Sequence, residues 1–155
     1  MTAILTFPSA AISGYKSATE ALELRAAAAL DTSYQYTSAG RVLGFDHLNL
    51  IFDYVKGDET SVQIVGQHGV LSDGTVEGTT WKDFWIILPA STGGISEVLP
   101  HILQFTAASF AASASGGVEV SMKAKQCVRF GVKRTLGTAP GTLGIRATAA
   151  IERGS

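Results

Sequence analysis

The sequence predicts a mainly β protein, built as a sandwich or barrel of short strands. Apolar residues alternate with polar or small ones in two segments of the C-terminal third, which is the pattern of strands with one buried face. These residues are Val128, Phe130 and Val132 in the first segment, and Leu143, Ile145, Ala147 and Ala149 in the second. Glycine-rich turns separate such segments at near-even spacing, as in all-β sandwiches. The 155 residues suffice for one domain.

The first 16 residues predict an extended N-terminal arm. Residues 1–16 are mostly small and apolar, with one proline and one glycine that interrupt any regular pattern. An apolar arm has to lie on its own domain or on a neighbouring subunit, so Ile4, Leu5 and Phe7 are candidate subunit contacts. Residues 17–155 then form a single domain.

Residues 17–30 fit two structures. Residues 17–20 read Ser-Ala-Thr-Glu, the pattern of a helix capping box, and strong helix formers follow. Leu22 and Leu24 nevertheless alternate with Glu23 and Arg25, which is a strand pattern. Local propensity favours a helix, whereas the β character of the rest of the chain favours a strand.

The clearest hairpin-like pair follows. Residues 47–55 alternate and place Leu48, Leu50, Phe52 and Tyr54 on one face. Residues 56–59 read as a turn, and residues 60–65 as the returning strand. We therefore expect a hairpin here.

The rest of the chain continues as strands and loops. Residues 66–79 hold four glycines and predict a loop that contains at most a short hairpin. Residues 80–88 and 101–106 predict strands, and residues 107–117 are small and loop-like in composition. The glycine-rich residues 137–141 predict a hairpin turn before the last strand.

No set of residues predicts catalysis, a cofactor or a metal site, so we do not expect an enzyme. The single cysteine, Cys127, lies in a predicted strand and is expected to be a small buried side chain. His47, His68 and His101 lack the spacing of metal ligands. The neighbouring acids Asp58 and Glu59 fall in a predicted turn, where carboxylates are usually solvated.

The charge pattern and the N-terminal residues exclude some partners. The net charge of −1 gives no electrostatic footprint for nucleic acid. The start of the chain does not resemble a signal peptide, and no apolar stretch approaches the length of a membrane helix, so we expect no membrane partner. Charged residues make up 16% of the chain against about 25% in typical domains, which suits a protein packed against neighbours.

Two groups of side chains are candidates for surface contacts. Arg129 and Lys133 share the strand face opposite the apolar residues, where they are either solvated or contact another subunit or a polyanion. Trp81 and Trp85, four residues apart on a strand, are expected to share one face. They belong either to the core or to a platform on which a sugar stacks.

The order of these features resembles small virion structural proteins of tailed bacteriophages. The resemblance rests on residues 24–34, 46–54 and 56–61, on the tryptophan strand, and on the pair 127–133 and 141–145. It implies an antiparallel, jelly-roll-like β-sandwich in which residues 24–30 form a strand, and we adopt the strand for this segment. It implies no catalytic residues.

The function that follows from this resemblance is structural. We expect a capsid decoration, or cement, protein that stabilises the shell by binding between subunits of the major capsid protein. We expect it to be a homo-oligomer, with a trimer favoured, made in the host cytoplasm and located in the virion. A neck, tail or fibre component of the virion is the alternative within this class. A carbohydrate-binding β-sandwich module that uses the tryptophans is the alternative outside it.

Overall fold

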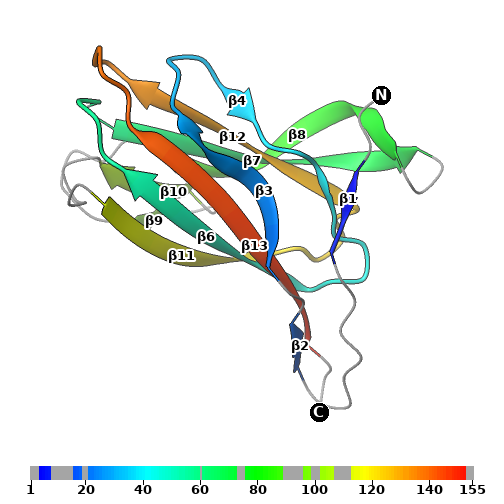
Figure 1. Ribbon diagram of the computed structural model, residues 1–155. Helices are drawn as coiled ribbons and strands as arrows, with labels where there is room; N and C mark the ends of the chain where they lie inside the picture. Colours follow the sequence, from blue (N-terminus) through cyan, green and yellow to red (C-terminus); the bar gives the residue numbers. More distant parts are fainter. Residues whose placement is uncertain are drawn as a thin grey trace.

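The computed structural model confirms a mainly β protein. It describes residues 4–7, 16–18, 21–59, 61–72, 76–88, 96–98, 102–106 and 113–152. Within these ranges it describes the side chains of residues 4–7, 21–59, 62–71, 80–84 and 119–151. All regular elements in the described ranges are strands (Figure 1). None of these residues forms a helix long and apolar enough to cross a membrane.

The strands form two sheets. The larger sheet has the order β1 (Leu5–Thr6), β5 (Gly40–Arg41), β12 (Cys127–Thr135), β7 (Ser61–Ser72), β8 (Val76–Leu88), β10 (Ile102–Thr106) and β9 (Ser96–Val98), and β4 (Gln35–Tyr36) also pairs with β12. The smaller sheet has the order β11 (Ser113–Ser121), β6 (His47–Val55), β13 (Thr142–Glu152) and β2 (Lys16–Ala18), and β3 (Leu22–Ala29) also pairs with β13. Pairing is antiparallel except between β1 and β5 and between β8 and β10, so the larger sheet is mixed.

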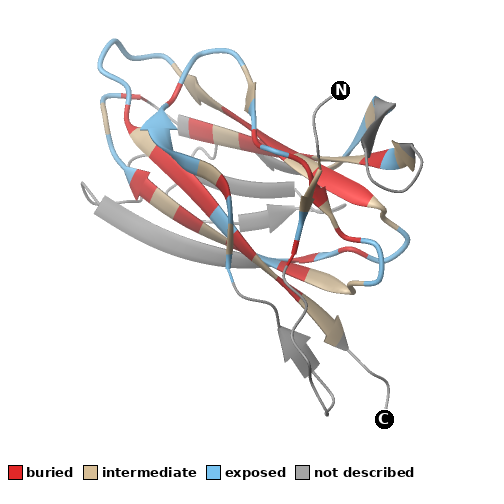
Figure 2. Ribbon diagram, turned by 45° about the vertical axis from the view of Figure 1, so that its right-hand side comes forward, coloured by how far each residue is buried: buried red, intermediate tan, exposed pale blue. Residues whose placement is uncertain are grey.

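One apolar core lies between the two sheets, and the alternating segments supply most of it. Alternate residues are buried over 48–54 in β6, 128–132 in β12 and 143–149 in β13, as the sequence pattern predicts (Figure 2). The core residues of these strands are Leu48, Leu50, Phe52 and Tyr54, Val128, Phe130 and Val132, and Leu143, Ile145, Ala147 and Ala149. Residues of opposite parity, such as Arg129 and Lys133 on β12, point away from this core, although Cys127 of the same parity is itself fully buried.

In the segment with two possible structures, Leu22–Ala29 form the strand β3. β3 pairs with β13 through register shifts near Ile145, and Leu24 is buried in the core. Pairing with β13 and burial of Leu24 override the helix propensity of the alanine-rich residues that follow.

The described part of the N-terminal arm lies on its own domain. Leu5 and Thr6 pair in parallel with Gly40 and Arg41. The Phe7 side chain is buried in the core, with its ring 6.0 Å from that of Phe45. Residues 1–3 and 8–15 lie outside the described residues.

The expected hairpin between residues 47–55 and 60–65 is wrong, because β6 belongs to the smaller sheet and β7 to the larger one. The expected hairpin turn at residues 137–141 is wrong for the same reason, since it connects β12 of the larger sheet to β13 of the smaller one. Both turns lie at the same end of the molecule and carry the chain from one sheet to the other (Figure 1).

Two neighbouring acids hold these crossing turns together. Glu59, expected to be solvated, is only 3% exposed and accepts hydrogen bonds from the Tyr54 hydroxyl and from the backbone N–H groups of Gly57 (3.0 Å) and Gly141 (2.7 Å). Asp58 accepts from the N–H groups of Thr138 and Ala139 at 3.0 and 2.9 Å. The two acids therefore connect residues 56–59 to residues 137–141. A turn within a single hairpin would need no such connection to a distant segment.

The hydrogen bonds to Glu59 also set the protonation of Glu59 and Tyr54. Burial acts to raise the pKa of Glu59, but the hydrogen bonds from Tyr54, Gly141 and Gly57 outweigh it and leave the pKa below its usual value. Burial, the hydrogen bond to Glu59 and its charge raise the pKa of Tyr54. The carboxylate therefore accepts and the hydroxyl donates at neutral pH.

β7 and β8 form the long hairpin of the larger sheet. β7 continues to Ser72 and β8 begins at Val76, so most of the expected loop at residues 66–79 is strand. A register shift also separates Trp81, which lies opposite Gly69, from Trp85, which lies opposite Gly66. The alternation that would place both tryptophans on one face is therefore broken, and the side chain of Trp85 lies outside the described ones. Further along, β11 begins at Ser113, inside the segment expected to be loop-like.

Candidate functional site

The outward face of the larger sheet carries a row of aromatic and charged side chains around Arg129. Arg129 alternates on β12 with the fully buried Val128 and Phe130, so it points away from the core. We call this group the aromatic–cation strip. Its members are Tyr34, Tyr36, Gln67, Trp81, Asp83, Arg129 and Lys133.

Two aromatic rings approach the guanidinium of Arg129. Its Cζ lies 4.1 Å from the centre of the Tyr36 ring and 4.4 Å from that of Trp81. Tyr36 comes from β4, which pairs with β12, and Trp81 comes from β8, which lies beyond β7 on the other side of β12 (Figure 1). Both distances allow cation–π attraction, so the rings hold the guanidinium from two sides of its strand.

Two glycines make room for the rings. A Cβ at Gly131 would lie 2.7 Å from Cε1 of Tyr36, and a Cβ at Gly69 would lie 3.1 Å from Cε3 of Trp81. The rings therefore lie against the backbone where the two strands carry no side chain.

Polar groups fix the orientation of Arg129. Its Nε donates to Oε1 of Gln67 at 2.9 Å, and Nε2 of Gln67 donates to Oδ1 of Asp83 at 2.8 Å. The three residues lie in register across β12, β7 and β8. The Asp83 carboxylate holds the amide of Gln67, and this amide holds the guanidinium of Arg129.

The strip continues to a second cation. Nζ of Lys133 lies 4.7 Å from the centre of the Tyr34 ring, and this ring stacks on that of Tyr36 with centres 6.1 Å apart. Burial, and then the charges of Tyr36 and Asp83, raise the pKa of the Tyr34 hydroxyl to about 12. The Tyr34 hydroxyl beside Lys133 is therefore neutral at neutral pH.

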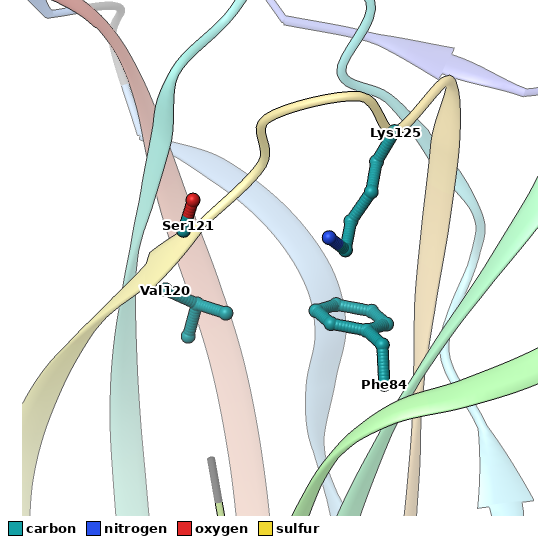
Figure 3. Close-up of a pocket in the computed structure, with 4 residues that line it drawn as sticks. All are labelled: Phe84, Val120, Ser121 and Lys125. Carbon is teal, nitrogen blue, oxygen red and sulfur yellow. The ribbon is translucent and has the colours of Figure 1, made fainter. Parts of the chain in front are cut away.

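A small pocket of about 110 Å³ lies between β8 and the β11 end, lined by Phe84, Val120, Ser121 and Lys125 (Figure 3). Nζ of Lys125 lies 4.8 Å from the centre of the Phe84 ring, and His68 contacts the same ring edge-on at 5.7 Å. Burial lowers the pKa of Lys125. The pocket holds one amine over one ring, which is a packing arrangement and not a set of groups for chemistry.

The structure brings together residues that the sequence placed in separate hypotheses. Arg129, Lys133 and Trp81 all belong to the strip, whereas Leu5 and Phe7 lie on or beneath the β1–β5 edge. Ile4, just before β1, is partly exposed.

Sequence reasoning missed four members of the strip: Tyr34, Tyr36, Gln67 and Asp83. The alternating tyrosines were a usable signal, because side chains two residues apart in an extended segment share one face. Nothing in the sequence indicated that they meet β12.

The remaining candidates stay apart. Cys127 is fully buried, as predicted, and its Sγ lies 3.2 Å from the carbonyl oxygen of Gly69. His47 lies 3.4 Å from Glu119, and His101 falls outside the described residues. Across the parts of the chain that the structure describes, no three His, Cys, Asp or Glu side chains are grouped to hold a metal ion.

Comparison with known proteins finds a likeness in structure. No family model and no curated protein sequence matches the chain. The fold is similar to the crystal structure of the SPBc2 prophage-derived protein YomS, with a TM-score of 0.46 and 12% identity, over 91% of this chain and 99% of that chain. A likeness at this TM-score and identity says nothing about what this chain binds.

Proposed function

We propose that this protein is a structural virion protein of a tailed phage that binds neighbouring protein subunits through the aromatic–cation strip. The observation that carries the binding role is Arg129 held beside Tyr36 and Trp81 on the outward face of the larger sheet. The resemblance of the sequence to tailed-phage virion proteins supports the proposed place of the protein in a virion. Within it we favour a capsid decoration protein, with a neck, tail or fibre component as the alternative.

The composition of the strip supports a protein partner. Tyrosine, tryptophan and arginine are the residues most enriched at energetically important interface positions. Tyr36 is 42% exposed, so its ring offers apolar area to a partner. Its place over Gly131 already restricts the ring, so little conformational entropy remains to be lost on binding.

The proposed effect on the particle is stabilisation by mass action. A protein that binds the assembled shell and not the free subunits shifts the equilibrium towards assembly, and the shift grows with its concentration. The partner surface is the major capsid protein or another virion subunit, and a homo-oligomer, with a trimer favoured, would present several strips at once. Multivalent presentation raises the overall affinity without any new contact.

Co-sedimentation with capsids assembled without this protein tests the proposal. The wild-type chain should bind saturably, and Trp81→Ala and Tyr36→Ala should each weaken binding at least about tenfold if the rings are central to the interface. Val55→Ala is the matched control, because Val55 is 48% exposed on the other sheet. Equal binding by all variants would reject the strip as the docking surface, and no binding by the wild type would reject the decoration role.

A carbohydrate-binding module is the second candidate, favoured by one observation. Trp81 lies beside the hydrogen-bonded pair Gln67 and Asp83, and an aromatic ring next to an amide and a carboxylate suits a sugar face and its hydroxyl groups. A glycan screen read by tryptophan fluorescence tests it. Binding that Trp81→Ala removes would favour this function over the structural one.

A further inference from the structure

We propose that Arg129 is the carboxylate-binding residue of the strip, and that the partner docks on it with an acidic, extended segment. This inference rests on the proposed function, because it names the chemistry of the partner that the strip would bind. It follows from which atoms of Arg129 are already used and from where the next cation lies.

The guanidinium uses one of its donors within the protein. Nε donates to Gln67, and among the described residues neither Nη atom has a hydrogen-bond partner. Asp83, the acid of this row, accepts from Gln67 and not from Arg129. The positive charge is therefore oriented by the protein but not paired with a carboxylate in the described part of the chain.

The surroundings suit recognition of a planar anion. The rings of Tyr36 and Trp81 lie at 4.1 and 4.4 Å, so they limit the rotation of the guanidinium while leaving its Nη edge without a partner. A planar guanidinium binds a carboxylate through two parallel N–H···O bonds, and fixing it in advance lowers the entropy lost on binding. Lysine at this position would keep the charge and lose this geometry.

The second cation sets the shape of the ligand. Lys133 lies four residues from Arg129 on the same side of β12, and its Nζ is held over the Tyr34 ring. Four residues of a strand span about 13 Å. An extended segment with two acidic residues four positions apart places one carboxylate at each cation. We commit to an extended acidic peptide as the ligand, and an acidic glycan is an alternative outcome of the test.

A pair of capped pentapeptides provides the probe. One has glutamate at its first and last positions with threonines between, and the other has glutamine in place of both glutamates. NMR titration of the full chain at low salt follows the Nε–H resonance of Arg129 and the indole N–H of Trp81. We expect the glutamate peptide to shift both resonances and the glutamine peptide to bind at least about tenfold more weakly, since charge-assisted bonds are about twice as strong as neutral ones.

Variants separate geometry from charge. Arg129→Lys should weaken binding of the glutamate peptide by about tenfold although the charge is kept. Lys133→Gln should weaken it by a smaller factor. Arg146→Lys is the matched control and should change nothing, because Arg146 lies on the other sheet in an exposed ion pair with Asp53. If Arg129→Lys unfolds, Gln67→Leu replaces it, since this change keeps the guanidinium and removes the bond that orients Nε, together with the bond from Gln67 to Asp83.

Several outcomes would overturn the inference. These are unchanged affinity in Arg129→Lys, equal binding of the two peptides, or no binding of either. Tighter Arg129-dependent binding of tetragalacturonate than of the glutamate peptide would assign the site to acidic glycans instead. Failure here is distinguishable from failure of the proposed function. If Trp81→Ala loses binding to the shell but the wild type does not bind the peptide, the strip keeps its docking role and the carboxylate site is rejected. If the wild type binds the peptide but not the shell, only the carboxylate site is kept.

Discussion

Glu59→Ala should strongly destabilise the domain, although Glu59 lies in a turn. Its carboxylate accepts from the buried Tyr54 hydroxyl and from two backbone N–H groups, those of Gly57 and Gly141. Alanine leaves all three donors without this acceptor at a place that is only 3% exposed. The change therefore removes a bridge between two sheets and not only a surface charge.

The size of the effect follows from these bonds. One hydrogen bond to a charged acceptor contributes about 1.5–3 kcal/mol. Contributions within one network are not additive, so we expect a loss of about 3–5 kcal/mol for the three together. This is a large part of the about 5–15 kcal/mol that stabilises a typical domain. Tyr54→Phe removes one donor and leaves the carboxylate with two, so it should cost about 1–2 kcal/mol.

Urea unfolding at neutral pH, followed by circular dichroism, measures these free energies. Glu23→Ala is the matched control, because Glu23 is exposed on β3, and it should change stability by less than about 0.5 kcal/mol. A double-mutant cycle with Tyr54→Phe and Glu59→Gln should show a coupling of about 1 kcal/mol or more. A Glu59→Ala variant as stable as Glu23→Ala would refute the assignment of Glu59 as the acceptor that joins the turns.

Three further predictions use other contacts. The pKa values of Glu59 and Asp58 are lower in the folded protein than their ordinary values of 4.5 and 3.8. The two carboxylates therefore stabilise the fold above these ordinary pKa values, and this stabilisation is lost as the pH falls through the lower pKa values of the folded state. Urea titrations from neutral to acidic pH should show this loss, and Glu59→Gln should show less of it. Gly131→Ala should displace the Tyr36 ring, because the new Cβ would lie 2.7 Å from Cε1, and ring resonances that stay in place would contradict the packing. Cys127 should react with Ellman's reagent only after unfolding because it is fully buried, whereas rapid labelling of the native protein would contradict its position.

The strands with a regular alternation could be predicted from the sequence. In β6, Leu48, Leu50 and Phe52 take the buried face, and Asn49 and Ile51 between them take the other. The period of two is a property of each strand alone, so it needs no knowledge of the partner. β3 was less certain because its residues suit both helix and strand, and only pairing with β13 decides between them.

The pairing of strands was not predictable in the same way. Residues 56–59 look like a hairpin turn locally, and Glu59 looks like a solvated acid. Their structure depends on Gly141, which is far away in the sequence and supplies a backbone donor to the carboxylate. The aromatic–cation strip likewise depends on contacts between distant parts of the sequence, since Tyr36, Trp81 and Arg129 come from three strands of one sheet. The sequence places Arg129 on an outer face and leaves Trp81 between the core and the surface, and it does not indicate that the two meet.

The central place of β13 has a consequence for how the chain is made. β13 lies between β6 on one side and β3 and β2 on the other, although it is the last strand of the described chain. During synthesis, β3 and β6 leave the ribosome long before the strand that joins them. The complete smaller sheet therefore forms only after β13 has emerged, and until then β3 and one side of β6 keep unpaired backbone edges. Such long-range pairing slows folding, so these strands are most exposed to aggregation just before β13 arrives.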